Sequence, residues 1–215
     1  MKKLYWKRAV KLVSLLLALV LLLLLLQEFP FREYWEYGQG SLRVKGFYRE
    51  PKNSLDVVLI GDSTIYAGYS PALAYAAGDI ASYHYSIGAL VCTAWEPITR
   101  DVLRRQDPQL LVVDVGGIQY DSLQEKFDAS STIHVMTDNM PLSGDKLRSI
   151  RTLMDRYGDD PWEYYLPFIR YHNEWAGLGE LAERTGEMLR WEFSSRNVLK
   201  GTAARVTWEP SAPSQ

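Results

Sequence analysis

Apolar and polar positions in the middle of the chain follow the pattern of a parallel sheet. Two short apolar runs rich in β-branched residues span 55–60 and 110–115, and the segment 80–86 can form a strand between them. Such runs are typical of strands buried on both faces of a sheet. Helical patterns at 71–77 and 93–105 alternate with them. The order strand, helix, strand, helix, strand predicts a doubly wound α/β sheet with right-handed crossovers.

The N-terminal 30 residues carry an apolar run from Leu12 to Leu26, interrupted only by Ser14. With its flanks the run reaches about 20 residues, enough to cross a bilayer as a helix. A cleaved signal peptide is the alternative, but no small-x-small cleavage pattern follows the run. We therefore expect residues 1–30 to be an uncleaved signal anchor.

Charge predicts the orientation of this anchor. Five of the 24 basic residues precede the apolar run, and none of the 26 acidic residues does. By the positive-inside rule the N-terminus should stay in the cytoplasm. The anchor would then cross the cell membrane once, and the chain after it would lie on the outer side of that membrane.

The remaining chain divides into three predicted parts. Residues 31–54 are expected to connect the anchor to an α/β domain over 55–200, and the tail 201–215 to be loose. The pattern changes after Tyr120, which predicts a helical insertion over about 120–193. Helical patterns within it lie at 147–157, 161–172 and 174–193.

Composition excludes several classes of protein. Hydrophobic residues make up 47% and charged residues 23%, as in a folded globular protein. Cys92 is the single cysteine, so an intrachain disulfide or a cysteine-based zinc site is excluded. There is no basic stripe of the kind that a nucleic-acid binder needs. We expect no metal site, because no second histidine or cysteine lies at helical or hairpin spacing from any of the three histidines, and we expect no other cofactor.

Three loops at strand ends are the candidate site. Residues 61–63, 86–88 and 116–117 each follow a predicted strand, and in doubly wound sheets ligands bind at the carboxyl ends of the strands. Ser63 could present its hydroxyl there at the start of a helix, with Gly61 allowing a sharp turn. The alternative is that 62–64 merely cap that helix.

Residues 56–64, Asp-Val-Val-Leu-Ile-Gly-Asp-Ser-Thr, resemble the first block of the SGNH/GDSL hydrolase family. A longer likeness covers about 44–177. It is to an exported subgroup that resembles the D-alanyl transfer protein of teichoic acid synthesis and the O-acyltransferases of envelope polysaccharides. Beyond the first block it is carried by Phe47-Tyr48, Pro51-Lys52-Asn53-Ser54-Leu55-Asp56, Thr137-Asp138-Asn139-Met140-Pro141-Leu142-Ser143 and Tyr171-His172-Asn173-Glu174-Trp175.

The resemblance implies an incomplete flavodoxin-like α/β/α domain of three layers with Ser63 as nucleophile. It implies oxyanion donors from the Ser63 backbone and Gly88, with Gly117 as the nearest match in the third block. That block, at 114–119, lacks the family's Gly-x-Asn-Asp, so the asparagine donor is missing. Asp62 and Thr64 would line the cleft.

The family's Asp-x-x-His base has no match in the printed sequence. His84, His134 and His172 are the three histidines, and none has Asp three positions earlier. We expect His84 to be structural and His134 to be solvated in a polar loop. His172 either lines the cleft or packs by hydrogen bonding.

Three hypotheses stay open. The first is an esterase or O-acyltransferase of cell-envelope glycans with Ser63 as nucleophile. The second is a non-catalytic envelope protein that binds a glycan or a membrane acyltransferase. The third is a truncated fragment of such an enzyme.

Overall fold

The computed structural model describes residues 2–28, 40–120, 126–158 and 160–171, and residues 182, 183, 185, 186 and 189. The chain divides into two compact units, which we treat separately. The described elements of the first unit are α1 (Lys2–Glu28), α8 (Trp162–Tyr165) and α9 (Pro167–Arg170). The second unit contains the elements from α2 to α7, both included.

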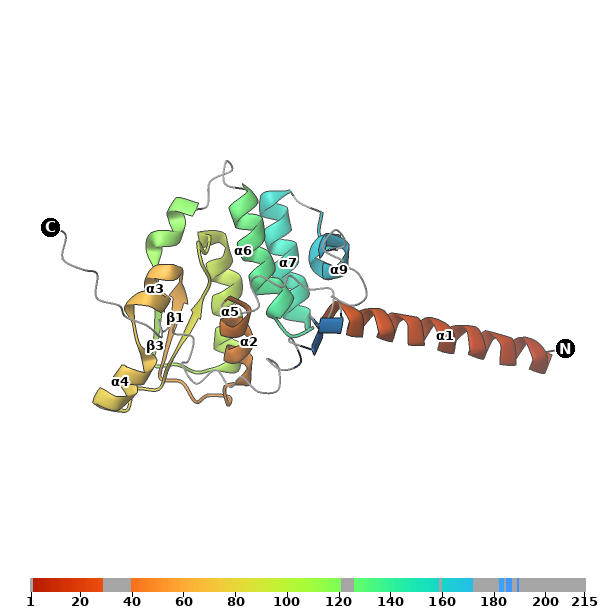
Figure 1. The fold of residues 1–215 in the computed structure, drawn as a ribbon, viewed down its shortest axis with the longest axis horizontal. Coiled ribbons are helices and arrows are strands. Elements are labelled where there is room, and N and C mark those ends of the chain that lie inside the picture. The colour runs from red at the N-terminus through yellow and green to blue at the C-terminus, as the bar shows by residue number, and fades with distance from the viewer. Residues whose placement is uncertain are drawn as a thin grey trace. The chain divides into compact units, whose positions relative to one another are not determined.

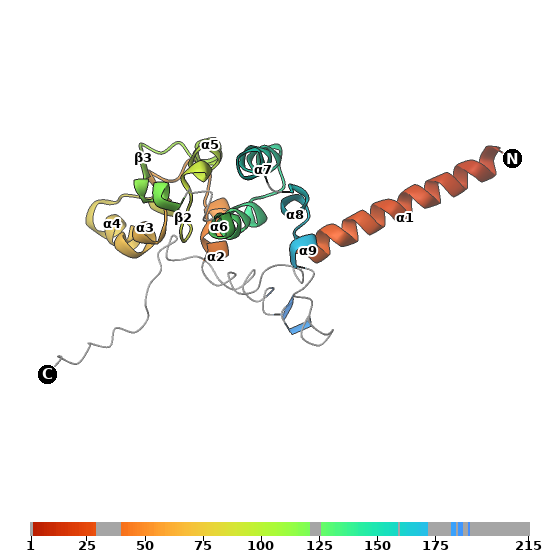
Figure 2. The same ribbon diagram turned by 90° about the horizontal axis from the view of Figure 1, so that it is seen from above.

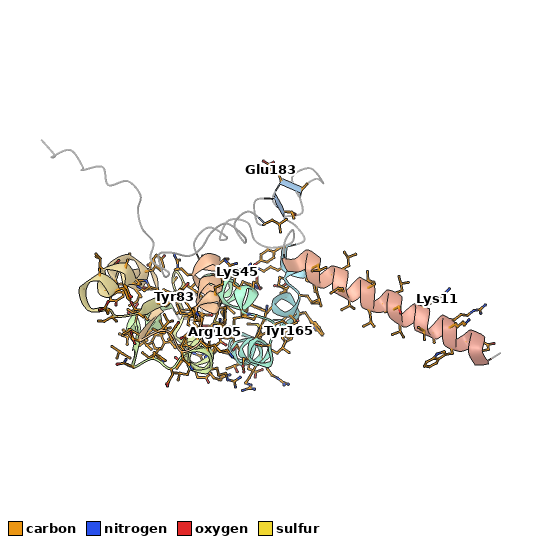
Figure 3. The ribbon with its side chains drawn as sticks, turned by 90° about the horizontal axis from the view of Figure 1, so that it is seen from below. Lys11, Lys45, Tyr83, Arg105, Tyr165 and Glu183 are labelled. Carbon is orange, nitrogen blue, oxygen red and sulfur yellow. The ribbon has the colours of Figure 1, made fainter. Side chains whose placement is uncertain are left out.

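Helix α1 contains the apolar run. Its segment Tyr5–Leu25 has a mean hydropathy of 2.5, and none of its residues is buried. Lys11 is among the basic residues near its N-terminal end, and its side chain projects from the helix (Figure 3). By length and composition this helix can cross a membrane, as an anchor or as a secretion signal.

The second unit is built on a parallel sheet with the strand order β2-β1-β3. The strands are β1 (Val57–Gly61), β2 (Ser82–Ser86) and β3 (Leu110–Val113). The predicted α/β element with parallel strands is thus confirmed. The third strand is shorter than predicted, because the chain turns after Val113 into the 3₁₀ segment η2 (Val115–Tyr120).

Helices cover both faces of this sheet (Figures 1 and 2). Helices α3 (Ser63–Gly68) and α4 (Pro71–Gly78) lie on one side, and α2 (Gly40–Arg49) and α5 (Trp95–Arg105) lie on the other. A 3₁₀ turn, η1 (Cys92–Ala94), precedes α5. Because strand side chains alternate, β2 turns Tyr83 and Tyr85 toward Phe47 of α2, at ring distances of 5.8 and 5.2 Å. It turns His84 toward Tyr69, at 5.4 Å.

Local signals explain the helix ends. Ser70 caps α4 through Leu73 N–H, and Pro71 occupies the first helical position, where its missing N–H is not needed. Ser143 caps α7 (Gly144–Tyr157) through Lys146 N–H at 3.1 Å. Gly158 ends α7 with φ of 68°, a left-handed conformation that suits glycine.

Two elements differ from the sequence-based expectation. The predicted connecting segment 31–54 contains α2, whose Val44 and Phe47 are fully buried in the core. Helix α6 (Lys126–Asn139) contacts α2 and α7, and every residue from Thr132 to Met140 is buried. The helix predicted at 147–157 agrees with α7, whereas α6 occupies a segment in which no individual helix was predicted. The predicted segments 174–193 and 201–215 fall largely or wholly outside the described residues.

Candidate functional site

Ser63 is the first residue of α3, directly after the carboxyl end of β1. The helix is capped by Asp62, whose Oδ1 accepts the Thr64 N–H at 2.7 Å and whose side chain is only 2% exposed. The Ser63 side chain is exposed, and its hydroxyl makes no hydrogen bond within the described part of the chain. Capping is therefore the role of Asp62, and the Ser63 hydroxyl is left available. Asp62 is enclosed rather than lining an open cleft, whereas Thr64 is exposed.

Gly61 is required for space and not for a special backbone angle. Its φ is not positive, so the expected sharp turn does not depend on a left-handed conformation. A Cβ on Gly61 would lie 2.6 Å from both Asp114 Cβ and Ile65 Cγ1. Any larger residue would push apart β3 and α3 at the point where Ser63 is placed.

Gly88 and Gly117, the two predicted oxyanion donors, lie in loops after β2 and β3. Gly88 is exposed, its Cβ position is 3.6 Å from Tyr66 Oη, and its carbonyl accepts the Thr132 hydroxyl at 3.2 Å. Gly117 is buried in η2, where a Cβ would collide with Leu90 O and lie 3.1 Å from the Trp95 ring. Close packing therefore restricts Gly117 but not Gly88, and the role of both glycines as donors stays a prediction.

Three enclosed polar side-chain atoms surround these loops. They are Asp114 Oδ2, Ser86 Oγ and Trp95 Nε1, and none has a hydrogen-bond partner among the described residues. Ser86 pairs with Gly61 in the sheet register, Asp114 packs against Gly61, and Trp95 packs against Gly117. Buried polar groups in native proteins are normally hydrogen-bonded. Their gathering at the carboxyl edge of the sheet is what a polar ligand site requires.

Arg43 brings a positive charge to the same edge. It is buried on α2, its Nε donates to Ser86 O at 2.9 Å, and its guanidinium lies 3.8 Å above the Tyr66 ring. Burial, assisted by the Arg43 charge, lowers the pKa of His84 to about 4, so His84 is neutral near pH 7. No pattern in the sequence singles out Arg43, because it lies in the segment 31–54 that was predicted to be a connection.

The three histidines have different outcomes. His84 lies fully buried in β2, which agrees with the expected structural role. The expectation for His134 is wrong: it is buried in α6 with Nδ1 3.5 Å from Asp138 Oδ1, because α6 is enclosed by neighbouring helices. His172 lies outside the described residues. Within the described ranges, no group of three or more His, Cys, Asp or Glu residues is placed to hold a metal ion.

No family model, curated protein or solved structure matches this chain. The resemblance to the SGNH/GDSL family therefore stays a prediction from the quoted motifs.

Proposed function

We propose that this protein is a membrane-anchored esterase or O-acyltransferase of the SGNH/GDSL type, acting on cell-envelope glycans with Ser63 as nucleophile. The observation that carries the proposal is the position of Ser63. It follows the central strand β1 at the carboxyl edge of a parallel sheet, with capping assigned to its neighbour Asp62. That edge is where open α/β sheets bind their ligands.

The surroundings of Ser63 support acyl transfer. The Ser63 hydroxyl would attack an ester carbonyl, and backbone N–H groups near Gly88 and Gly117 would stabilise the oxyanion. The parallel strand order β2-β1-β3 supports the proposal, because a flavodoxin-like sheet, the architecture that the family likeness implies, begins with the same order. Unpartnered polar atoms at the same edge suit a substrate rich in hydroxyl groups.

The apolar helix α1 supports action at the membrane. We propose that it stays as a single-pass anchor with its basic end in the cytoplasm, which places the α/β unit outside. Envelope polysaccharide, and a membrane acyltransferase that supplies acyl groups, would then be within reach. The proposed chemistry uses no cofactor, because serine-based acyl transfer needs only a base and oxyanion donors.

Labelling with a fluorophosphonate probe tests the proposal. The full-length protein in detergent should become covalently labelled, as Ser63 Oγ displaces fluoride from phosphorus. Ser63→Ala should abolish the label. Ser54→Ala is the matched control, because Ser54 is an exposed hydroxyl before the amino end of β1, bonded to Pro51 O at 2.8 Å; its labelling should equal that of the wild type.

Absence of label on the wild-type protein, under conditions where a known serine esterase reacts, would refute the enzymatic proposal. Glycan binding that survives Ser63→Ala in the same preparation would then favour a binding protein.

A further inference from the structure

Asp114 occupies the carboxyl end of β3, next to the strand that delivers Ser63. Its backbone N–H donates to Ile60 O at 2.8 Å, so it extends the β1–β3 ladder by one step beyond Val113. This register sets Asp114 beside Gly61, two residues before Ser63. No motif in the sequence marks it out, because a single Asp after an apolar strand is an ordinary loop residue.

Only one of the two Asp114 carboxylate oxygens accepts a hydrogen bond from the described residues. Oδ1 accepts the Gly116 N–H at 3.0 Å and forms a local turn. Oδ2 is enclosed by protein and has no hydrogen-bond donor in the described part of the chain. Leaving a carboxylate oxygen enclosed without a donor is unfavourable, so its retention calls for a partner that the described residues do not supply.

The direction of the side chain points to the Ser63 turn. The Cβ position of Gly61 is 2.6 Å from Asp114 Cβ and 3.4 Å from Asp114 Oδ2. The same position is 2.6 Å from Ile65 Cγ1. The Asp114 carboxylate is therefore packed against Gly61, two residues before Ser63, and Ile65 of α3 packs against the same position.

We infer that Asp114 Oδ2 is the proton acceptor for Ser63, an inference that rests on the proposed acyl transfer. The Ser63 O–H bond breaks and its proton passes to Oδ2, while Oγ forms a bond to the acyl carbonyl carbon. The C–O bond to the leaving alcohol then breaks, and that oxygen takes the proton from Asp114. Attack by an acceptor hydroxyl or by water repeats the two proton transfers in reverse order.

This assignment does not require the serine–carboxylate hydrogen bond to exist before substrate binds. Catalytic hydrogen bonds are often long in the unliganded state and tighten when the substrate arrives. The exposed Ser63 hydroxyl, unbonded within the described chain, is compatible with that behaviour. The second carboxylate oxygen stays on Gly116 N–H throughout and keeps Asp114 oriented.

The test is Asp114→Asn in the full-length protein, with fluorophosphonate labelling as the readout. Asn keeps an acceptor for Gly116 N–H but cannot take a proton, so the labelling rate should fall about 100-fold or more, the usual contribution of a general base. Asp155→Asn, an exposed carboxylate on α7, is the matched control and should label like the wild type. If Asp114→Asn does not fold, Asp114→Ser, whose hydroxyl can accept from Gly116 N–H, carries the same test.

A nucleophile exchange separates proton transfer from a structural role. In a Cys92→Ala background, Ser63→Cys should react with iodoacetamide, because a thiol ionises without a strong base. Adding Asp114→Asn should change that rate less than about fivefold if Asp114 acts as a base. An equal loss for the serine and cysteine proteins would overturn the inference in favour of a structural role.

The two proposals fail in distinguishable ways. If Ser63→Ala abolishes labelling but Asp114→Asn labels at the wild-type rate, the nucleophile stands and the role of Asp114 is overturned. If the wild-type protein is never labelled, the acyl-transfer proposal itself fails and the inference fails with it.

Discussion

The two faces of strand β2 differ in whether their polar side-chain atoms have hydrogen-bond partners. On the α2 face, Tyr83 Oη donates to Arg43 O at 2.8 Å. Tyr85 Oη lies 3.4 Å from Tyr48 Oη, which in turn donates to the Asp101 carboxylate. Every tyrosine hydroxyl of this face thus has a protein partner, and Figure 3 shows Tyr83 within the interior of the unit.

The α3 face changes along the strand. Ser82 Oγ, at the amino end, is 3.1 Å from Tyr69 Oη. Both ring nitrogens of His84 and the Ser86 Oγ are enclosed and have no partner among the described residues. Toward the carboxyl end of β2, side-chain polar atoms therefore lack hydrogen-bond partners among the described residues. Ser63 follows the adjacent strand β1 at this same end.

We relate the α2 face of β2 to stability and the carboxyl end of its α3 face to function. Burial raises the pKa of Tyr48 and Tyr85 further above 10, so both hydroxyls of the α2 face stay protonated near pH 7. Burial also raises the pKa of Asp101. The hydrogen bond from Tyr48 acts in the opposite direction and lowers the pKa of Asp101. Unpaired buried polar atoms cost stability, and proteins tolerate such features mainly at functional sites.

The largest effect on stability is expected from Phe47→Ala, which removes a core side chain from the α2 face of β2. Phe47 is fully buried and makes edge-on contacts with Tyr48, Tyr83 and Tyr85. Removing the ring should lower the free energy of unfolding by about 3–5 kcal/mol, measured by denaturant unfolding of the α/β unit. Leu73→Ala, which truncates an exposed side chain, should change it by less than about 0.5 kcal/mol. Equal effects of the two variants would contradict the assignment of this face as the stability core.

The next effect concerns His84 and appears only in acid. Its pKa is about 4 in the folded protein and near 6.5 when unfolded. The neutral ring is favoured by folding, so the full stability is present above pH 6.5 and is lost as the pH falls from 6.5 to 4. The loss should reach roughly 3 kcal/mol. In His84→Leu this part of the pH dependence should vanish; an unchanged slope in that variant would show that another group titrates.

The smallest effect comes from a matched pair of neighbours in β2. Tyr85→Phe removes a hydroxyl that has a partner and should cost about 1 kcal/mol. Ser86→Ala removes an enclosed hydroxyl without one, so the free energy of unfolding should stay within about 0.5 kcal/mol or rise. Thermal unfolding of both variants measures the difference. A loss for Ser86→Ala as large as that for Tyr85→Phe would remove the contrast between the faces.

Local patterns predicted the strands well: β1 and β3 are short apolar runs followed by turn residues, and β2 is a short segment with two tyrosines followed by a glycine-containing turn. The predicted 55–60, 80–86 and 110–115 agree with β1, β2 and β3 to within two residues at each end. The α2 and α6 helices were missed for different reasons. Helix α2 is short and lies in a polar context, while α6 has no apolar stripe, since it is buried on all sides over 132–140.

The sequence by itself determined the apolar N-terminal helix, the parallel strands and the placement of Ser63 directly after the first strand. These follow from apolar runs and from turn and capping residues, which act over a few positions. Only the tertiary structure decided that Asp62 takes the cap, that Arg43 reaches Ser86, and that Asp114 packs against Gly61. Those last contacts join residues about 40 to 50 positions apart. They depend on strand order and helix packing, which no local pattern encodes.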